Sequence, residues 1–403
     1  MLKFMNGRNI CKTIVLGVEV ILKILTFNGV YLPGYKAGGP IRSLANLASH
    51  LKDDIELYIL TRDRDAGDTE PYENIEFNKW VKLTNEHVFY QKEKEMSIFT
   101  LRRIINCNDY HGVLLNGILS EYTIRYLLLR RLKLIKSKPT IIMPHGDLSR
   151  GALSLKNKKK SIYLKIAKIL GLYDGLVWLA TSDSEKNDTL KVFGRKDIVT
   201  IPNLPYHSSQ NGNDFINIKE KGNLDVIYIS RITKVKNLLF ALKVLNDVKG
   251  YVNFNIYGPI SDNDYWNSCQ KFISSMNRNI KVKYHGSLPH EKVKLVFKRS
   301  DVLLLPTLGE NYGHVIVEAL SVGVPVIISD QTPWRNLSLR NAGWDIPLEN
   351  ENGYANAIQT LVDMDKEEFL KFKFGAKKYL KEVQKVSETK EAYTKLFKET
   401  YTS

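Results

Sequence analysis

Short, uninterrupted runs of apolar residues recur along the chain, each bounded by polar or turn-forming residues. Such runs are typical of strands buried on both faces, and helical apolar periodicity lies between several of them. This alternation predicts an α/β fold in which helices cover both faces of a parallel sheet. In the first half, the predicted elements are strands Val20–Phe27, Ile55–Thr61, Gly112–Asn116, Thr140–Met143, Leu176–Ala180 and Ile198–Ile201, with helices Ile41–Leu51 and Ser120–Ile135.

The alternation stops after Pro202 and resumes at Asp225, and the polar stretch between them has no sustained apolar period. This stretch is the best candidate for a linker, so a second doubly wound domain is predicted after it. From Lys366 onward the sequence predicts only charged amphipathic helix. The predicted organisation is an N-terminal extension without assigned role (1–19), a first Rossmann-like domain (20–205), a linker (206–223), a second Rossmann-like domain (224–385) and a C-terminal helix (386–403).

In the second half, the predicted strands are Asp225–Ile229, Val252–Tyr257, Val282–Tyr284, Asp301–Leu305 and Pro325–Ser329, and the predicted helices are Leu238–Val248, Asp264–Met276, His290–Arg299 and Gly313–Val322. The carboxyl ends of parallel strands are where open α/β sheets bind ligands. Two such domains joined by a linker therefore predict a cleft in which these ends face each other.

Composition fits two globular domains, because 403 residues are enough for a full core in each. The 59 lysines and arginines exceed the 43 acids, giving a net charge of +16 that indicates a polyanionic partner: nucleic acid, anionic lipid or a phosphorylated small molecule. The three cysteines lack C-x-x-C spacing, which excludes a disulfide framework and indicates a reducing compartment. No apolar run reaches the ~18 residues of a spanning helix. We therefore expect a cytoplasmic protein that at most touches a membrane surface.

Two glutamates lie eight residues apart in Leu305–Val326, which reads LPTLGENYGHVIVEALSVGVPV. The pattern predicts that Glu310 lies in the loop after a strand, and that Glu318 lies on the helix beginning near Gly313. A ligand along that helix N-terminus could contact both carboxylates and the free backbone N–H groups from Asn311 onward. The simpler interpretation is a surface glutamate and an acid that favours the helix dipole.

Three further segments combine a predicted strand end with candidate binding residues. Arg231 and Lys236 follow the first strand of the second domain, where they either meet a diphosphate or form a solvated charged loop. His145 lies in Pro-His-Gly directly after a strand, and is either a ligand-facing group or an ordinary turn residue. Gly38 and Gly39 precede a helix that begins after Pro40, which permits close backbone approach but equally fits a plain tight loop.

These motifs, in this order, resemble the retaining glycosyltransferases of family 4, which have the GT-B fold. That family shows E-G-F-G, then E-A, then G-x-P-V. The corresponding stretches here are Glu310-Asn311-Tyr312-Gly313, Glu318-Ala319 and Gly323-Val324-Pro325-Val326. Asn311 stands where glycine is usual, and Tyr312 is a conservative replacement. The resemblance covers about residues 20–385.

The resemblance implies roles for these residues. Glu310 would contact donor-sugar hydroxyls and Glu318 the ribose, while Arg231 and Lys236 would meet the diphosphate. The implied catalytic residues are Arg231, Lys236, Glu310 and His145. The implied donor-binding residues are Gly38, Gly39, Asn311, Tyr312, Gly313 and Glu318. No metal and no cofactor is expected, because the nucleotide diphosphate sugar is itself a substrate.

Two other patterns in the chain have both a functional and a simpler interpretation. Asp-x-Asp pairs, which bind metal in the other large glycosyltransferase fold, occur at Asp63/Asp65, Asp262/Asp264 and Asp363/Asp365, a number unremarkable for this length. Lys156–Lys168 holds six lysines and no acid. It is either a solvated helix face or a basic amphipathic helix that rests on an anionic membrane surface.

The resemblance thus implies a retaining hexosyltransferase that moves a sugar from a nucleotide diphosphate sugar to a saccharide or lipid-linked saccharide acceptor. The resemblance points to bacterial cell-surface polysaccharide biosynthesis, such as capsule or lipopolysaccharide. The alternatives are a nucleotide-sugar 2-epimerase of the same architecture and a non-catalytic transferase homologue. Nucleic-acid binding would rest on charge alone, since no recognised module is present.

Overall fold

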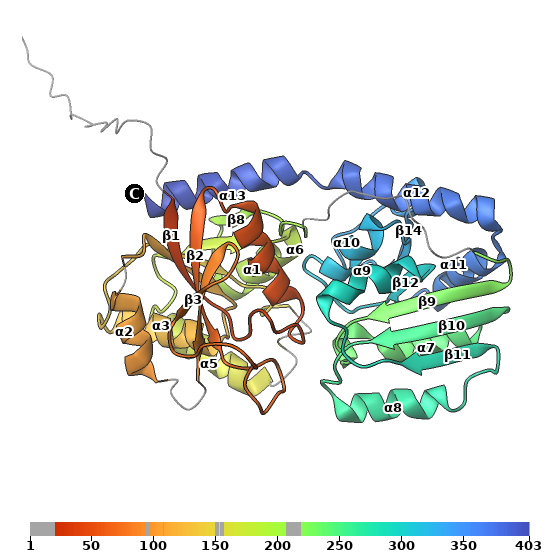
Figure 1. The fold of residues 1–403 in the computed structure, drawn as a ribbon, viewed down its shortest axis with the longest axis horizontal. Helices are drawn as coiled ribbons and strands as arrows, with labels where there is room; N and C mark the ends of the chain where they lie inside the picture. The colour runs from red at the N-terminus through yellow and green to blue at the C-terminus, as the bar shows by residue number, and fades with distance from the viewer. Residues whose placement is uncertain are drawn as a thin grey trace, which may run out of the picture.

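The computed structural model of the protein describes residues 21–92, 97–107, 109–149, 153, 157–206 and 219–402. Figure 1 shows two sheets side by side, each flanked by helices. The α/β fold with two doubly wound domains is therefore confirmed. Residues 1–19 and most of the predicted linker lie outside the described residues, so the domain boundaries stay a prediction.

The first sheet has the strand order β3-β4-β2-β1-β5-β6-β7-β8. Its pairs are parallel except β3 with β4, a pair that the sequence did not predict. The order changes direction between β1 and β5, which is the switch point where such sheets bind ligands. The strands are β1 (Leu22–Phe27), β2 (Ile55–Arg62), β3 (Trp80–Lys82), β4 (Glu86–Gln91), β5 (Gly112–Asn116), β6 (Thr140–Met143), β7 (Val177–Ala180) and β8 (Ile198–Thr200).

The second sheet is parallel throughout, with the order β11-β10-β9-β12-β13-β14. Its switch point lies between β9 and β12, the strands that precede Lys236 and Glu310. The strands are β9 (Asn223–Ile229), β10 (Tyr251–Tyr257), β11 (Ile280–Tyr284), β12 (Val302–Leu305), β13 (Val326–Ser329) and β14 (Gly343–Ile346).

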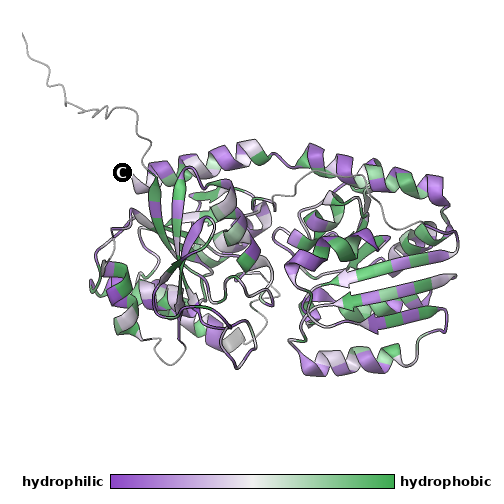
Figure 2. Cartoon of the chain, in the orientation of Figure 1, coloured by the Kyte–Doolittle hydropathy of each residue, from purple (hydrophilic) through white to green (hydrophobic). Residues whose placement is uncertain are grey.

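Helices on both faces of each sheet bury the apolar strands, which appear as green bands in Figure 2. In the first domain they are α1 (Gly39–His50), α2 (Ile98–Cys107), α3 (Glu121–Arg131), α5 (Asn157–Ile169) and α6 (Asp183–Phe193). In the second domain they are η2 (Lys234–Lys236), α7 (Leu238–Asn246), α8 (Asn263–Ile273), α9 (His290–Lys298), α10 (His314–Ser321), η3 (Ser338–Arg340), α11 (Glu351–Asp363) and α12 (Lys366–Val383).

The last helix, α13 (Val386–Tyr401), returns to the first domain (Figure 1). Tyr401 Oη donates a hydrogen bond of 2.9 Å to the carbonyl of Val113, and Tyr393 Oη donates one of 3.5 Å to that of Ile201. The ring of Tyr401 lies so close to Gly112 that a Cβ there would be 2.0 Å from it. Tyr393 and Tyr401 thus belong to the same apolar core as β1 and β2.

Candidate functional site

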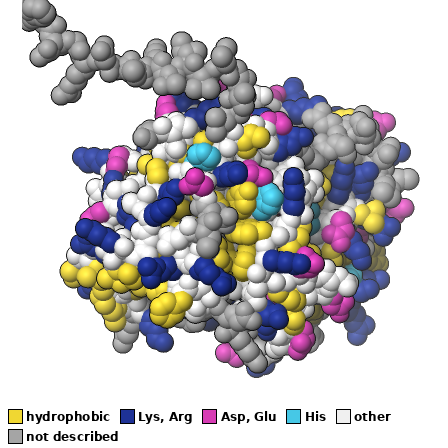
Figure 3. All heavy atoms as spheres, turned by 60° about the vertical axis from the view of Figure 1, so that its left-hand side comes forward, with side chains coloured by type: hydrophobic (Ala, Val, Ile, Leu, Met, Phe, Trp, Pro, Cys, Tyr) yellow, Lys and Arg dark blue, Asp and Glu magenta, His cyan; other side chains and the backbone are white. Residues whose placement is uncertain are grey.

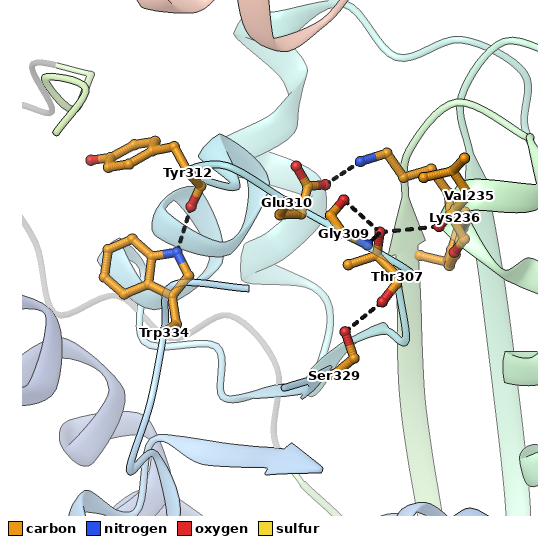
Figure 4. A network of polar contacts seen from close by, with 9 residues as sticks. Val235, Lys236, Thr307, Gly309, Glu310, Tyr312, Ser329 and Trp334 are labelled. Atoms are coloured by element: carbon orange, nitrogen blue, oxygen red, sulfur yellow. Dashed lines mark hydrogen bonds and ion pairs between the residues drawn. The ribbon is translucent and has the colours of Figure 1, made fainter. Parts of the chain in front are cut away.

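Lys236 and Glu310, which are 74 positions apart, form an ion pair beyond the carboxyl ends of β9 and β12. Lys236 Nζ lies 2.5 Å from Glu310 Oε1, and both side chains are largely buried (Figure 4). Hydrogen bonds hold the two loops together: Leu308 N–H donates to the carbonyl of Val235 over 2.8 Å, and Thr307 Oγ1 donates to the same carbonyl over 3.2 Å. The structure therefore brings together two residues that the sequence assigned to one site.

Arg231 lies on the loop after β9 and is exposed. Within the described part of the chain, no residue forms a hydrogen bond or ion pair with its guanidinium. The backbone N–H groups of Tyr312, Gly313 and His314, at the start of α10, likewise donate to no acceptor among the described residues. A free cation and free N–H donors at a helix N-terminus are the groups that bind a phosphate.

The segment that opens α10 is anchored from the core side. Trp334 Nε1 donates a hydrogen bond of 2.6 Å to the carbonyl of Tyr312 (Figure 4), and Gln384 Nε2 donates one of 3.2 Å to Tyr312 Oη. The Tyr312 side chain is therefore buried, and its N–H is the backbone group that bonds to no described residue. Gly313 has φ +76°, and a Cβ there would lie 2.8 Å from the Ile316 side chain, which explains glycine at this position.

Glu318 on α10 lies among groups from both domains. Its Oε1 is 3.5 Å from His290 Nδ1, and burial raises its pKa to about 7 despite the opposing effect of Arg42 on α1. Burial lowers the pKa of His290 to about 4, so this imidazole is neutral near pH 7 and does not compensate the carboxylate. Arg42 follows the predicted Gly-Gly loop, but the sequence did not reveal its closeness to Glu318.

His145 has the positive φ of 50° and lies at the carboxyl end of β6, as expected. Burial lowers its pKa to about 4, so the ring is neutral. Asn116 donates its amide N–H to Thr26 Oγ1, which leaves the Asn116 oxygen as acceptor for His145 Nε2 at 3.1 Å. This bond assigns the proton to Nε2 and leaves Nδ1 as an acceptor for a ligand hydroxyl.

Gly38 caps α1 and Gly39 is its first residue, so this helix begins earlier than predicted, and its first turn faces the second domain. A Cβ on Gly39 would lie 3.8 Å from the ring of His314, whereas one on Gly38 would meet nothing within 4 Å. Ser43 Oγ lies 2.9 Å from His314 Nε2, so the start of α1 contacts the start of α10 directly. The structure therefore places the first-domain glycine turn beside the start of α10, the segment that the sequence analysis expected to bind the donor.

Glu185 is a buried residue that the sequence analysis missed. Its carboxylate accepts hydrogen bonds from Gly146 N–H at 2.7 Å and from Asn311 Nδ2 at 3.0 Å. Its sequence signal, Ser182 followed three residues later by an acid, indicates only a helix N-terminus. That local pattern does not reveal a contact with a residue 126 positions away.

The Asp-x-Asp pairs mostly serve local structure. Asp65 accepts hydrogen bonds from the N–H groups of Tyr35 and Ala66, at 2.8 and 2.7 Å. Asp262 and Asp365 cap α8 and α12. No group of three potential metal ligands occurs among the described residues. Two surface cavities, of about 640 and 430 Å³, lie elsewhere on the second domain.

Known proteins share this architecture. The crystal structure of HepE from Anabaena in complex with UDP and glucose superposes with a TM-score of 0.67, at 15% identity, over 94% of this chain and all of that one. The two facing sheet domains therefore define the GT-B fold. Residues 209–378 match the family described as glycosyl transferases group 1.

Two relatives were found by sequence. An uncharacterized 41.2 kDa protein in the cps region of Klebsiella pneumoniae is 25% identical over 57% of this chain and 62% of its own length. The O-antigen chain mannosyltransferase RfbU of Salmonella typhimurium is 24% identical over 38% of this chain and 43% of its own length. The chain thus matches less than two thirds of either relative.

Proposed function

We propose that the protein is a glycosyltransferase that uses a nucleotide diphosphate sugar to extend a saccharide or lipid-linked saccharide for a cell-surface polysaccharide. The observation that carries this proposal is the Lys236–Glu310 pair at 2.5 Å. Arg231 and the start of α10 lie at the same edge of this sheet, and neither the guanidinium nor these N–H groups bond to any residue that the structure describes. The group 1 family domain, the named function of RfbU, and the UDP and glucose bound by HepE support it.

In the proposed reaction, Arg231 and the α10 N-terminus hold the diphosphate, while Glu310 accepts hydrogen bonds from hydroxyls of the sugar. Lys236 exchanges part of its contact with Glu310 for the leaving phosphate. Because the negative charge on that phosphate grows as the glycosidic bond breaks, these groups stabilise the transition state more than the bound substrate. We propose retention of the anomeric configuration and a hexose as the transferred sugar.

The test is a panel of UDP-, GDP-, ADP- and dTDP-hexoses, each with and without oligosaccharide acceptors. We expect nucleotide to be released only in the presence of acceptor. NMR of the product should show the same anomeric configuration as the donor. Turnover of UDP-N-acetylglucosamine without any acceptor would instead indicate the 2-epimerase. A product of inverted configuration would contradict the proposed mechanism.

We also propose that α5 contacts an anionic membrane surface that presents a lipid-linked acceptor. Lys156 lies outside the described residues, but α5 exposes Ile162, Ile166 and Ile169, the last at 84%, on one face of a lysine-rich helix. Figure 3, in which the left-hand side of Figure 1 comes forward, shows hydrophobic side chains exposed among lysines and arginines. No helix in the described part of the chain is both long and apolar enough to span a membrane.

A further inference from the structure

The carboxylate of Glu185 accepts hydrogen bonds from three segments of the chain, which contain Thr181, Gly146 and Asn311. It is 2% exposed, at the start of α6, and its Oε2 accepts hydrogen bonds from Thr181 N–H at 2.6 Å and Thr181 Oγ1 at 2.8 Å. Its Oε1 accepts one from Gly146 N–H at 2.7 Å, in the turn that carries His145. Glu185 is thereby fixed within the first domain.

One further hydrogen bond crosses to the second domain. Asn311 Nδ2, directly after Glu310, donates to the same Oε1 of Glu185 at 3.0 Å. A Cβ on Gly146 would lie 2.8 Å from Asn311 Nδ2, so a side chain at position 146 would displace the amide. Gly146, Glu185 and Asn311 therefore meet at one point, where the His145 turn faces the loop that carries Glu310.

A second contact across the domains lies three residues further along. Ser43 Oγ and His314 Nε2 are 2.9 Å apart. Burial, together with the nearby charge of Arg42, lowers the pKa of His314 to about 3, so this imidazole stays neutral in ordinary assay conditions. The free N–H groups of Tyr312 and Gly313 lie between the two contacts.

We propose that Glu185 and Asn311 are positioning residues, whose hydrogen bond holds the two domains closed and sets the Glu310 loop against the His145 turn. Glycine, the residue usual at position 311 in the resembling family, has no side chain to make this bond. Only the effect of this bond on turnover rests on the proposed function; its effect on domain closure does not.

The first experiment measures the distance between the domains without any substrate. The native cysteines are replaced, and new cysteines at Ile169 on α5 and Gln270 on α8 carry spin labels. Pulsed electron paramagnetic resonance then gives the distribution of distances between the two labels. We compare N311G, N311D and E185Q with the wild type. The matched control is N74G, which changes an exposed asparagine of the first domain with φ +57° that forms no hydrogen bond or ion pair with any described residue of the second domain.

A hydrogen bond to a charged group typically changes an equilibrium by about 10- to 100-fold. N311G and E185Q should therefore broaden the distribution toward longer distances, and N311D, which opposes two carboxylates, should broaden it most. The E185Q/N311G double variant should open no further than N311G alone, because N311G already removes the bond that E185Q only weakens. Distributions of N311G and N311D that superpose on those of the wild type and N74G would overturn the proposal.

The second experiment separates positioning from stability. With the donor identified, N311G should lower kcat about tenfold or more while the donor KM changes less, because the open form still binds donor through the second domain. The melting temperature of N311G should stay close to that of N74G. An unchanged kcat would overturn the catalytic part. If no transfer is detected in any variant, the proposed function fails, while the distance measurement still decides the closure.

Discussion

The elevated pKa of Glu318 predicts that ionising this residue costs folding stability. Burial raises its pKa from 4.5 to about 7, which corresponds to about 3 kcal/mol, because each pKa unit is worth about 1.4 kcal/mol. The folded protein holds this proton between pH 4.5 and 7 and the unfolded chain does not. The contribution of Glu318 to stability is therefore complete below pH 4.5 and is lost as the pH rises to 7.

The conservative variant Glu318→Gln isolates this contribution. His145, His290 and His314 all have lowered pKa values. They therefore lower the stability of the fold as the pH falls through 6.5, whereas Glu318 lowers it as the pH rises. They titrate in both proteins, so their effect cancels in the difference. We expect the stability of Glu318→Gln relative to the wild type to increase by about 2 to 3 kcal/mol between pH 5 and pH 8.

The assay is urea unfolding of both proteins at pH 5, 6, 7 and 8, followed by tryptophan fluorescence, since Trp334 and Trp344 lie in the second domain. Thermal melting of the same samples provides an independent measure. A difference between the two proteins that stays constant over this range would refute the reasoning, because it would mean that Glu318 ionises as readily in the fold as in water.

Three further outcomes are expected. Arg231→Ala and Lys236→Ala should each lower kcat by about 10²–10³, because each removes a preorganised electrostatic partner of the leaving group. Glu318→Ala should chiefly raise the donor KM. Near-normal kcat in both the Arg231 and the Lys236 variant, measured by steady-state kinetics, would exclude this diphosphate site. Transfer should survive excess EDTA, and a loss that only Mn²⁺ or Mg²⁺ restores would show a metal requirement. The protein should pellet with anionic liposomes at low salt and be released as the salt concentration rises. The double variant Ile166→Ser/Ile169→Ser should pellet less. Equal binding to neutral liposomes would contradict an electrostatic attraction between α5 and the membrane.

Most of the buried parallel strands were predictable because each contains an apolar run, as β5 and β6 show with bounds identical to the prediction. Strand β4 was missed although it is buried and parallel to β2, because Glu86, His87 and Gln91 leave it only a short apolar run. Strand β3 was missed because Trp80–Lys82 is short and partly exposed at the sheet edge, which leaves no apolar run. Strand β14 was missed for a similar reason, since Gly343–Ile346 includes the partly exposed Asp345.

The site was predictable where its residues lie next to strand ends. Lys236 and Glu310 follow neighbouring strands of one sheet, so the topology alone brings them together. Glu185 and Arg42 could not be predicted, because their importance arises from contacts between two separately folded sheets. The apolar periodicity of the sequence does not predict which face of one domain contacts the other.

The position of α13 has a consequence for how the protein is synthesised. Domains generally fold one after another as the chain leaves the ribosome, with the N-terminal domain first. Here Tyr393 and Tyr401, which complete the core beside β1 and β5, are translated after all strands of the second domain. The surface of the first domain beside Gly112 therefore stays exposed until α13 has been synthesised. Nascent chains stalled before α13 should bind chaperones through that surface and release them once Tyr401 has emerged.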